Sequence, residues 1–150
     1  MRVIDCFDKD HWYLSNFTFS YFTLDGVEWE TVEHYFQAMK TTNEDERERI
    51  RICGHPRIAK KFGRQVELRS DWEDVKESIM TVAVREKFKQ NDILRKHLFE
   101  TGDDYLIEGN SWHDNIWGDC LCDKCKGIEG QNLLGKILME VRRELWENKS

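Results

Sequence analysis

Apolar side chains recur at helical spacing in three segments of the chain, and this pattern constrains the fold more than any other feature. Val32, Tyr35, Phe36 and Met39 stand at i, i+3, i+4 and i+7, which places them on one face of a helix. The spacing recurs in Trp72, Val75, Ile79, Val82 and Ala83, and in Leu134, Ile137, Leu138, Val141 and Leu145. We therefore expect amphipathic helices that begin at Thr31, Ser70 and Asn132, the second of them extending to 88.

Shorter helices are indicated between these segments. Residues 43–51 are highly charged, which is typical of a solvated helix with ion pairs between residues four apart. Pro56 favours the start of a helix that ends near Gly63. Asn91 or Asp92 can cap the next one.

Strand signals are fewer. Residues 17–23 are rich in Thr, Phe and Tyr, and Asp25-Gly26 separates them from residues 27–29, which predicts a hairpin with a type I′ turn. Residues 105–107 favour a short strand, and residues 110–130 form a long polar loop of the kind that often carries function. The expected class is α+β, predominantly α-helical, with an N-terminal β-hairpin.

Length and charge bound the function. The 150 residues are enough for one domain, expected to span 1–150, and one proline and nine glycines leave no room for a Pro-rich or Gly-rich linker. The net charge of −6 argues against a chain-wide surface for nucleic acid or anionic membrane, although it allows a local basic pocket.

The expected compartment is the cytoplasm. The apolar runs are only a few residues long, so we expect no membrane segment. Residues 1–5 lead into charged residues rather than an apolar stretch, so no secretory signal is expected either. An odd number of cysteines, five, fits reduced thiols better than a disulfide framework.

Glu33 is the first candidate for chemistry. It lies in the first turn of an expected helix, where a carboxylate generally stabilises the helix dipole by about 0.3–1 kcal/mol, and position alone favours that structural role. Glu33-His34 does not begin a metalloprotease HExxH motif, because residue 37 is Gln.

The segment 108–119 is the second candidate. Aromatic residues alternate there with carboxylates and amides, which suits a pocket for a polar planar ligand. A loop anchored by its tryptophans, with Asp and Asn as turn residues, explains the same pattern equally well.

Cys120, Cys122 and Cys125 form the third candidate, a weak one for zinc. Two of them have CxxC spacing, but a closed zinc site needs four ligands, so His113 or His11 would have to complete it. Free thiols are the simpler interpretation.

Two further features concern phosphate binding and packing. A basic group could hold a phosphate, although a solvated helix face explains its lysines singly: Lys60, Lys61, Arg64 and Arg69. Trp72 is most simply a core residue. Gly135 costs its helix about 1 kcal/mol relative to alanine, which suggests close approach of another backbone.

Taken together, these segments resemble the NADAR (YbiA-like) family, collinearly from about Tyr13 to Arg142. The resemblance is carried by Tyr13-Leu14-Ser15-Asn16-Phe17, Asp25-Gly26-x-x-Trp29, Glu33-His34-Tyr35-Phe36-Gln37-Ala38-x-Lys40, Ala59-Lys60-Lys61-x-Gly63-Arg64, Asp71-Trp72-x-x-Val75-Lys76-x-x-x-Met80, Lys87-Phe88-x-Gln90-Asn91, Leu98-x-x-Thr101-Gly102-Asp103, Glu108, Asp114-x-x-Trp117-Gly118-Asp119 and Gly130-x-Asn132-x-Leu134-Gly135-x-x-Leu138-Met139-x-x-Arg142. The sequence departs from the family pattern at 120–129, where the cysteines lie.

The resemblance implies the family's fold and an N-glycosidase that hydrolyses a ribosyl C1′–N bond. The substrate would be a phosphoribosylamino-pyrimidine intermediate of riboflavin biosynthesis or an ADP-ribosylated guanine in nucleic acid. A non-catalytic module that binds ADP-ribose or NAD is the alternative. No cofactor is expected beyond the candidate zinc, and the oligomeric state is not indicated.

The resemblance also implies the site residues. The catalytic candidates are Glu33, Trp72, Asp114 and Asp119, with Glu33 nearest the ribose and one of the two aspartates as second acid or base. The expected substrate-binding residues, with Lys40 and Arg64 holding phosphate and Trp117 stacking, are Asn16, Phe17, His34, Gln37, Lys40, Arg64, Trp117, Gly118 and Asn132.

Overall fold

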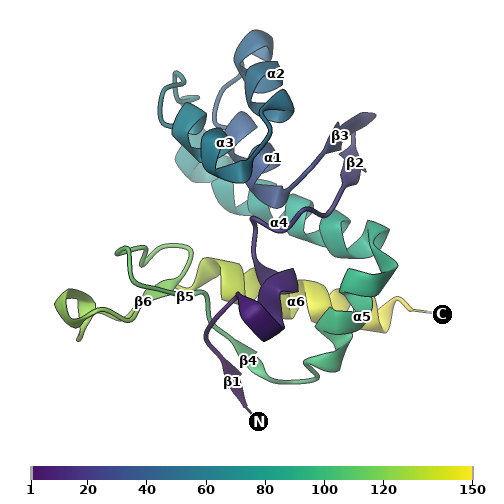
Figure 1. Ribbon diagram of the computed structural model, residues 1–150, viewed down its shortest axis with the longest axis vertical. Coiled ribbons are helices and arrows are strands. Elements are labelled where there is room, and N and C mark those ends of the chain that lie inside the picture. The colour runs from purple at the N-terminus through teal and green to yellow at the C-terminus, as the bar shows by residue number, and fades with distance from the viewer. Residues whose placement is uncertain (1, 150) are drawn as a thin grey trace. The chain divides into compact units, whose positions relative to one another are not determined.

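The computed structural model describes residues 2–149 (Figure 1). Met1, part of the segment on which the expectation about a secretory signal was based, lies outside them. Helices supply most of the regular structure, and the strands pair two by two, so the expected α+β class is confirmed. The chain divides into two compact units, one formed by Asn16–Asp92 and the other by the chain up to Ser15 together with Ile93 onward. None of the helices in the described part of the chain combines the length and apolarity that a membrane span requires.

Helix α1 is the centre of the Asn16–Asp92 unit. The elements of this unit are β2 (Phe22–Leu24), β3 (Val27–Trp29), α1 (Val32–Ala38), α2 (Glu44–Ile52), α3 (Pro56–Gly63) and α4 (Trp72–Gln90). Helix α1 contacts α2, α3, α4 and β3, while β2 lies against α4 (Figure 1). Residues on α1 therefore meet most of the unit's other elements.

The hairpin forms where the Asp-Gly pair predicts it. Strands β2 and β3 are antiparallel, and both turn residues have positive φ, 52° at Asp25 and 78° at Gly26, as a type I′ turn requires. The first strand is shorter than expected, because residues 17–21 lie outside it and continue the pairing only through a hydrogen bond from Ser20 N to Glu30 O.

Side chains at the helix starts explain which boundary predictions were right. Thr31 caps α1, since its Oγ1 accepts a hydrogen bond from His34 N at 3.0 Å. The expectation that Ser70 caps α4 is wrong: the N-cap is Asp71, and its carboxylate binds Arg69 instead of a helix amide.

The ion pairs within α2 differ from the expected spacing. They join residues three apart rather than four, as between Glu48 and Arg51.

The second unit is built from short elements around α6. They are β1 (Val3–Ile4), the 3₁₀ helix η1 (Lys9–Leu14), α5 (Asp92–Glu100), β4 (Tyr105–Leu106), β5 (Gly109–Asn110), β6 (Asp119–Cys120), η2 (Asp123–Cys125) and α6 (Leu133–Glu147). Strand β4 pairs in parallel with β1, and β5 with β6. The predicted strand at 105–107 thus gains its partner from the N-terminus, and the long polar loop holds a strand pair of its own.

Gly135 is required by close packing, as its place inside a helix suggested. A Cβ atom there would collide with the carbonyl oxygen of Leu106 and with the side chain of Asn132. Helix α6 can therefore approach β4 only with glycine at this position.

His34 is a buried structural residue. Its Nε2 donates to Cys53 O at 2.9 Å, and its Nδ1 lies 2.8 Å from Thr31 Oγ1, which pairs both ring nitrogens within the unit. Burial lowers the pKa of His34, despite the opposing effect of the Cys53 carbonyl. The neutral ring therefore ties the N-terminus of α1 to the end of α2.

We expect His34 to make folding pH-dependent. The pKa of His34 is lower in the folded state, so the unfolded chain binds a proton at a higher pH than the folded chain does. The contribution of His34 to the free energy of unfolding is therefore complete above pH ~6.5. Below that pH the contribution falls by at most about 1.4 kcal/mol per pH unit. Urea unfolding at pH 7.5 and 5.0 should show that the stability gap between the wild type and His34→Gln narrows at the lower pH. A gap that stays constant, or the same narrowing in His11→Gln, would contradict the assignment.

Gly135→Ala should destabilise the protein by about 1–3 kcal/mol through overpacking, although alanine is the better helix former. Gly54→Ala is the matched control, because no atom lies within 4 Å of the added methyl group. Thermal unfolding of both variants measures the difference, and equal melting temperatures would refute the close-packing explanation.

Candidate active site

The carboxylate of Glu33 is buried in the first turn of α1, with only 7% of the residue exposed. Its backbone amide donates to Asn16 O at 3.1 Å, and its Oε2 accepts a hydrogen bond from Gln37 Nε2 at 3.1 Å. Glu33 and Gln37 are four residues apart, so both side chains lie on one face of the helix. The carboxylate therefore lies at the positive end of the helix dipole and beside the Gln37 amide.

Gln37 has a buried acceptor left over. Its Oε1 is buried and accepts no hydrogen bond within the described part of the chain. Such atoms are rare in folded proteins and mark places where a water or ligand donates. Gly63 makes room for this amide, because a Cβ at Gly63 would collide with Gln37 Oε1. The sequence indicated Gly63 only as a helix end and did not reveal this packing role.

An amine and two aromatic rings adjoin the acid. Lys40 Nζ lies 5.7 Å from the centre of the Phe36 ring and 6.0 Å from that of Trp72, and the two rings are 5.1 Å apart. Trp72 is buried, as expected of a core residue. The neighbours of the Trp72 ring therefore include a cation over its face as well as the tilted Phe36 ring.

Charges couple Lys40 to Glu33 and to the basic group. Burial lowers the pKa of Lys40 most, the Glu33 carboxylate opposes that change, and the positive charges of Arg64 and Lys60 lower the pKa further. The structure thus couples one buried carboxylate electrostatically to Lys40, which also interacts with Arg64 and Lys60.

Arg69 has a different role from the other members of the basic group. Its guanidinium binds the Asp71 carboxylate, with Nε 2.6 Å from Oδ1, and donates to Met39 O at 3.3 Å. Its backbone amide donates to Lys40 O at 2.8 Å. Arg69 therefore holds the start of α4 against the end of α1.

Three of the expected substrate-binding residues of this unit have defined places. The side chain of Asn16 donates to Met80 Sδ at 3.5 Å, Phe17 is 38% exposed, and both ring nitrogens of His34 are used within the fold. Asn16 positions Glu33 through its backbone carbonyl rather than through its amide.

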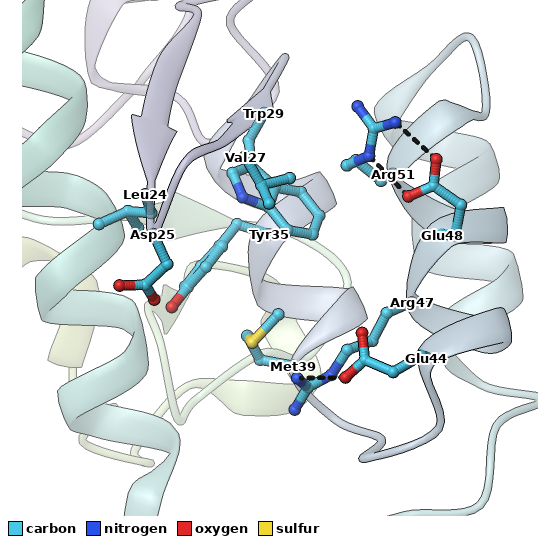
Figure 2. A pocket seen from close by; sticks show the side chains of 10 residues that line it. All are labelled: Leu24, Asp25, Val27, Trp29, Tyr35, Met39, Glu44, Arg47, Glu48 and Arg51. Carbon is cyan, nitrogen blue, oxygen red and sulfur yellow. Dashed lines mark hydrogen bonds and ion pairs between the residues drawn. The ribbon is translucent and has the colours of Figure 1, made fainter.

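A separate hollow of about 180 Å³ is lined by residues of the hairpin, α1 and α2 (Figure 2). Tyr35 and Met39 point into it, and these two residues alternate with Glu33 and Gln37 around the helix. The arginines that line it pair with acids of their own helix, Arg47 with Glu44 and Arg51 with Glu48. The hollow is therefore distinct from the surroundings of Glu33.

In the second unit, Asp114 organises its own loop. Its Oδ1 accepts hydrogen bonds from Ile116 N at 3.0 Å and Trp117 N at 2.9 Å. Asp119 Oδ1 accepts one from Gly130 N at 3.2 Å. Both candidate aspartates thus hold the backbone of the segment 114–130.

The rest of this segment is bound to α6. Backbone amides of residues 131–134 donate to carbonyls of residues 115–118, which satisfies the first turn of the helix without a side-chain cap, and the amide of Leu134 binds Trp117 O at 2.9 Å. Gly118 has no room for a Cβ beside Glu108. The Asn132 side chain bridges Glu108 N and Leu106 O at 2.9 Å each, so its amide is employed within the fold.

The cysteines of the loop lie together. Cys120, Cys122 and Cys125 surround the ring of His113, so the structure selects His113 over His11, which lies in η1.

We expect opposite pKa changes at Lys40 when its charged neighbours are neutralised. Glu33→Gln removes the charge that supports the protonated amine and should lower the pKa of Lys40, whereas Arg64→Gln should raise it. NMR titration of the Lys40 side chain measures both shifts. Unchanged values in both variants would show that these groups do not share one site.

The comparisons with known proteins agree on one family. The NADAR domain model matches residues 6–146. The chain is 41% identical to N-glycosidase YbiA of Escherichia coli over 91% of this chain and 82% of that protein. It is 37% identical to a riboflavin biosynthesis protein of Vibrio vulnificus, over 94% of this chain and 37% of that one.

A solved structure supports the same assignment. The NMR structure of E. coli YbiA superposes with a TM-score of 0.84 at 38% identity, covering 98% of this chain and 88% of that one. The match in sequence and in fold extends over nearly the whole chain, and the predicted resemblance is confirmed: the chain belongs to the NADAR family.

Proposed function

We propose that this chain is an N-glycosidase that hydrolyses a ribosyl C1′–N bond, with Glu33 as its central carboxylate. The observation that carries the proposal is the buried Glu33 carboxylate, paired with Gln37 and electrostatically coupled to Lys40. The name of the E. coli relative, N-glycosidase YbiA, supports the reaction type.

The chemistry requires a negative charge close to the sugar. Cleavage of the C1′–N bond develops positive charge on the ribose ring, and a carboxylate that is removed from bulk water stabilises that charge strongly. Glu33 takes this role and orients the attacking water. Gln37 is a positioning residue, because its amide donates to one carboxylate oxygen and so sets the direction of the carboxylate.

The cations and the indole serve binding. Lys40 and Arg64, with Lys60 beside them, hold the substrate phosphate, since a charged acceptor forms strong hydrogen bonds with both kinds of side chain. Trp72 supplies an apolar wall that excludes water. A phosphate would also offset the mutual repulsion of the three cations, which lowers the pKa of Lys40 in its absence.

Asp119 is the better candidate for the second acid or base. Asp114 Oδ1 already accepts hydrogen bonds from two backbone amides, whereas Asp119 Oδ1 accepts one. A carboxylate oxygen that already accepts two backbone hydrogen bonds has less acceptor capacity left for a substrate or water. Trp117 is assigned to stacking on the base.

The proposed substrate is a phosphoribosylamino-pyrimidine. The Vibrio relative's name, riboflavin biosynthesis protein, supports this choice over an ADP-ribosylated guanine. The free thiols of the five cysteines suit a reducing cytoplasm, where such an intermediate would be made.

Glu33→Gln tests the proposal, because it keeps the shape and the Gln37 partner but removes the charge. We expect a fall in turnover of about 100-fold or more, with substrate affinity and thermal stability close to those of the wild type. Glu77→Gln, at an exposed position on α4, is the matched control and should keep full activity.

Release of ribose 5-phosphate from the pyrimidine intermediate, and of ADP-ribose from ADP-ribosylated guanosine, is measured in parallel. Full activity in Glu33→Gln would overturn the assignment of Glu33. Saturable binding of ADP-ribose or NAD by the wild type, with no product from either substrate, would establish the binding-module alternative instead.

A further inference from the structure

Four potential metal ligands converge in the loop that follows β5. They are the Nδ1 atom of His113 and the Sγ atoms of Cys120, Cys122 and Cys125, and all four atoms lie within 4.8 Å of one another. His113 Nδ1 is 3.3 Å from Cys125 Sγ, 3.4 Å from Cys122 Sγ and 3.9 Å from Cys120 Sγ. The three sulfur atoms therefore surround one face of the imidazole nitrogen.

These separations suit a tetrahedral ion. Zinc binds sulfur at about 2.3 Å and imidazole nitrogen at about 2.0–2.1 Å, so a tetrahedral site separates sulfur from nitrogen by roughly 3.5 Å. The three distances from His113 Nδ1 fall on either side of that value. Three cysteines with one histidine is also a donor set of structural zinc sites.

The backbone is shaped to present these ligands. His113 has a φ of 69°, in the left-handed region that a non-glycine residue rarely adopts, and this conformation places its ring among the sulfur atoms. Pairing of β5 with β6 sets Cys120 opposite Asn110. The short helix η2 turns the chain between Cys122 and Cys125, and Cys125 N donates to Cys122 O at 3.2 Å.

Asn115 supports the cluster from outside. Its Nδ2 lies 3.5 Å from Cys125 Sγ, and its Oδ1 accepts from Cys120 N at 2.8 Å. Hydrogen bonds of this kind orient metal ligands. One amide thus fixes two of the four ligand-bearing residues.

A disulfide explains the arrangement less well than a metal. Cys120 and Cys125 are buried, at 4% and 5% exposed, and the structure records all three cysteines of the loop as free thiols. A disulfide between any two sulfur atoms would not explain why the third sulfur and the His113 ring, with its left-handed backbone, also lie within 4.8 Å. A single ion uses all four.

We propose that His113, Cys120, Cys122 and Cys125 form a closed structural zinc site. Four protein ligands leave no open position, so the ion takes no part in hydrolysis. Binding displaces the thiol protons and fixes residues 113–125, and with them the segment that carries Asp114, Trp117 and Asp119. The inference rests on the ligand geometry alone and does not require the proposed glycosidase activity.

Metal analysis of the untagged chain, purified under reducing conditions from zinc-supplemented cells, tests the site. We expect about one zinc per chain in the wild type and a loss of most of it in Cys122→Ser and in His113→Asn. Asparagine tolerates the left-handed backbone at residue 113, so this variant removes the ligand with little change in conformation. Cys6→Ser, an exposed cysteine of the same unit outside the cluster, should keep its zinc.

Cobalt provides a second readout that does not depend on activity. Co²⁺ added to the metal-stripped wild type should give the intense visible absorption of tetrahedral thiolate coordination, and Cys122→Ser should lack it while its far-ultraviolet circular dichroism is kept. A wild type that neither retains zinc nor gives this cobalt spectrum would overturn the proposal, as would full zinc content in both ligand variants.

Discussion

The carboxylate of Glu33 is withdrawn from water, and a buried charge of this kind costs several kcal/mol unless the protein supplies partners. The Asn16–Asp92 unit supplies them from different parts of the chain. The Asn16 carbonyl accepts from the Glu33 amide, and Gln37 donates to the carboxylate. The positive charge of Lys40 attracts the carboxylate. Gly63 on α3 makes the space in which the Gln37 amide can turn toward Glu33.

Hydrogen bonds hold helix α1 at both ends. At its N-terminus, Thr31 and His34 form hydrogen bonds that reach Cys53 after α2. At its C-terminus, Arg69 binds the carbonyls of Met39 and Lys40 as well as Asp71. A helix of this length is marginal alone, so tertiary contacts stabilise it and set the direction of Glu33.

The second unit stabilises its loop by polar means. The carbonyls of residues 115–118 satisfy the amides at the start of α6, while Asp114 and Asn132 take up other backbone groups. Few large apolar side chains of segment 111–130 are buried. Hydrogen bonds therefore stabilise the conformation of this segment in place of a hydrophobic core. A metal held by His113 and the three cysteines would add the strongest such bonds in this segment.

Local chemistry in the sequence determined much of the fold: the Thr31 cap, the Asp25-Gly26 turn, the helix from Pro56 to Gly63, and a glycine at 135 where a backbone approaches. The first three act between residues that are neighbours along the chain or along one helix, whereas Gly135 indicated only that some backbone approaches, and the fold identified it as that of Leu106. Tertiary structure alone decided that Arg69 binds the end of α1 through Met39 and Lys40, that residues 3–4 pair with β4, and that His113 rather than His11 lies among the cysteines. Motif resemblance identified Glu33, but its burial and its coupling to Lys40 depend on α3 and α4 packing against α1, because contacts between distant segments arise only when the chain is folded.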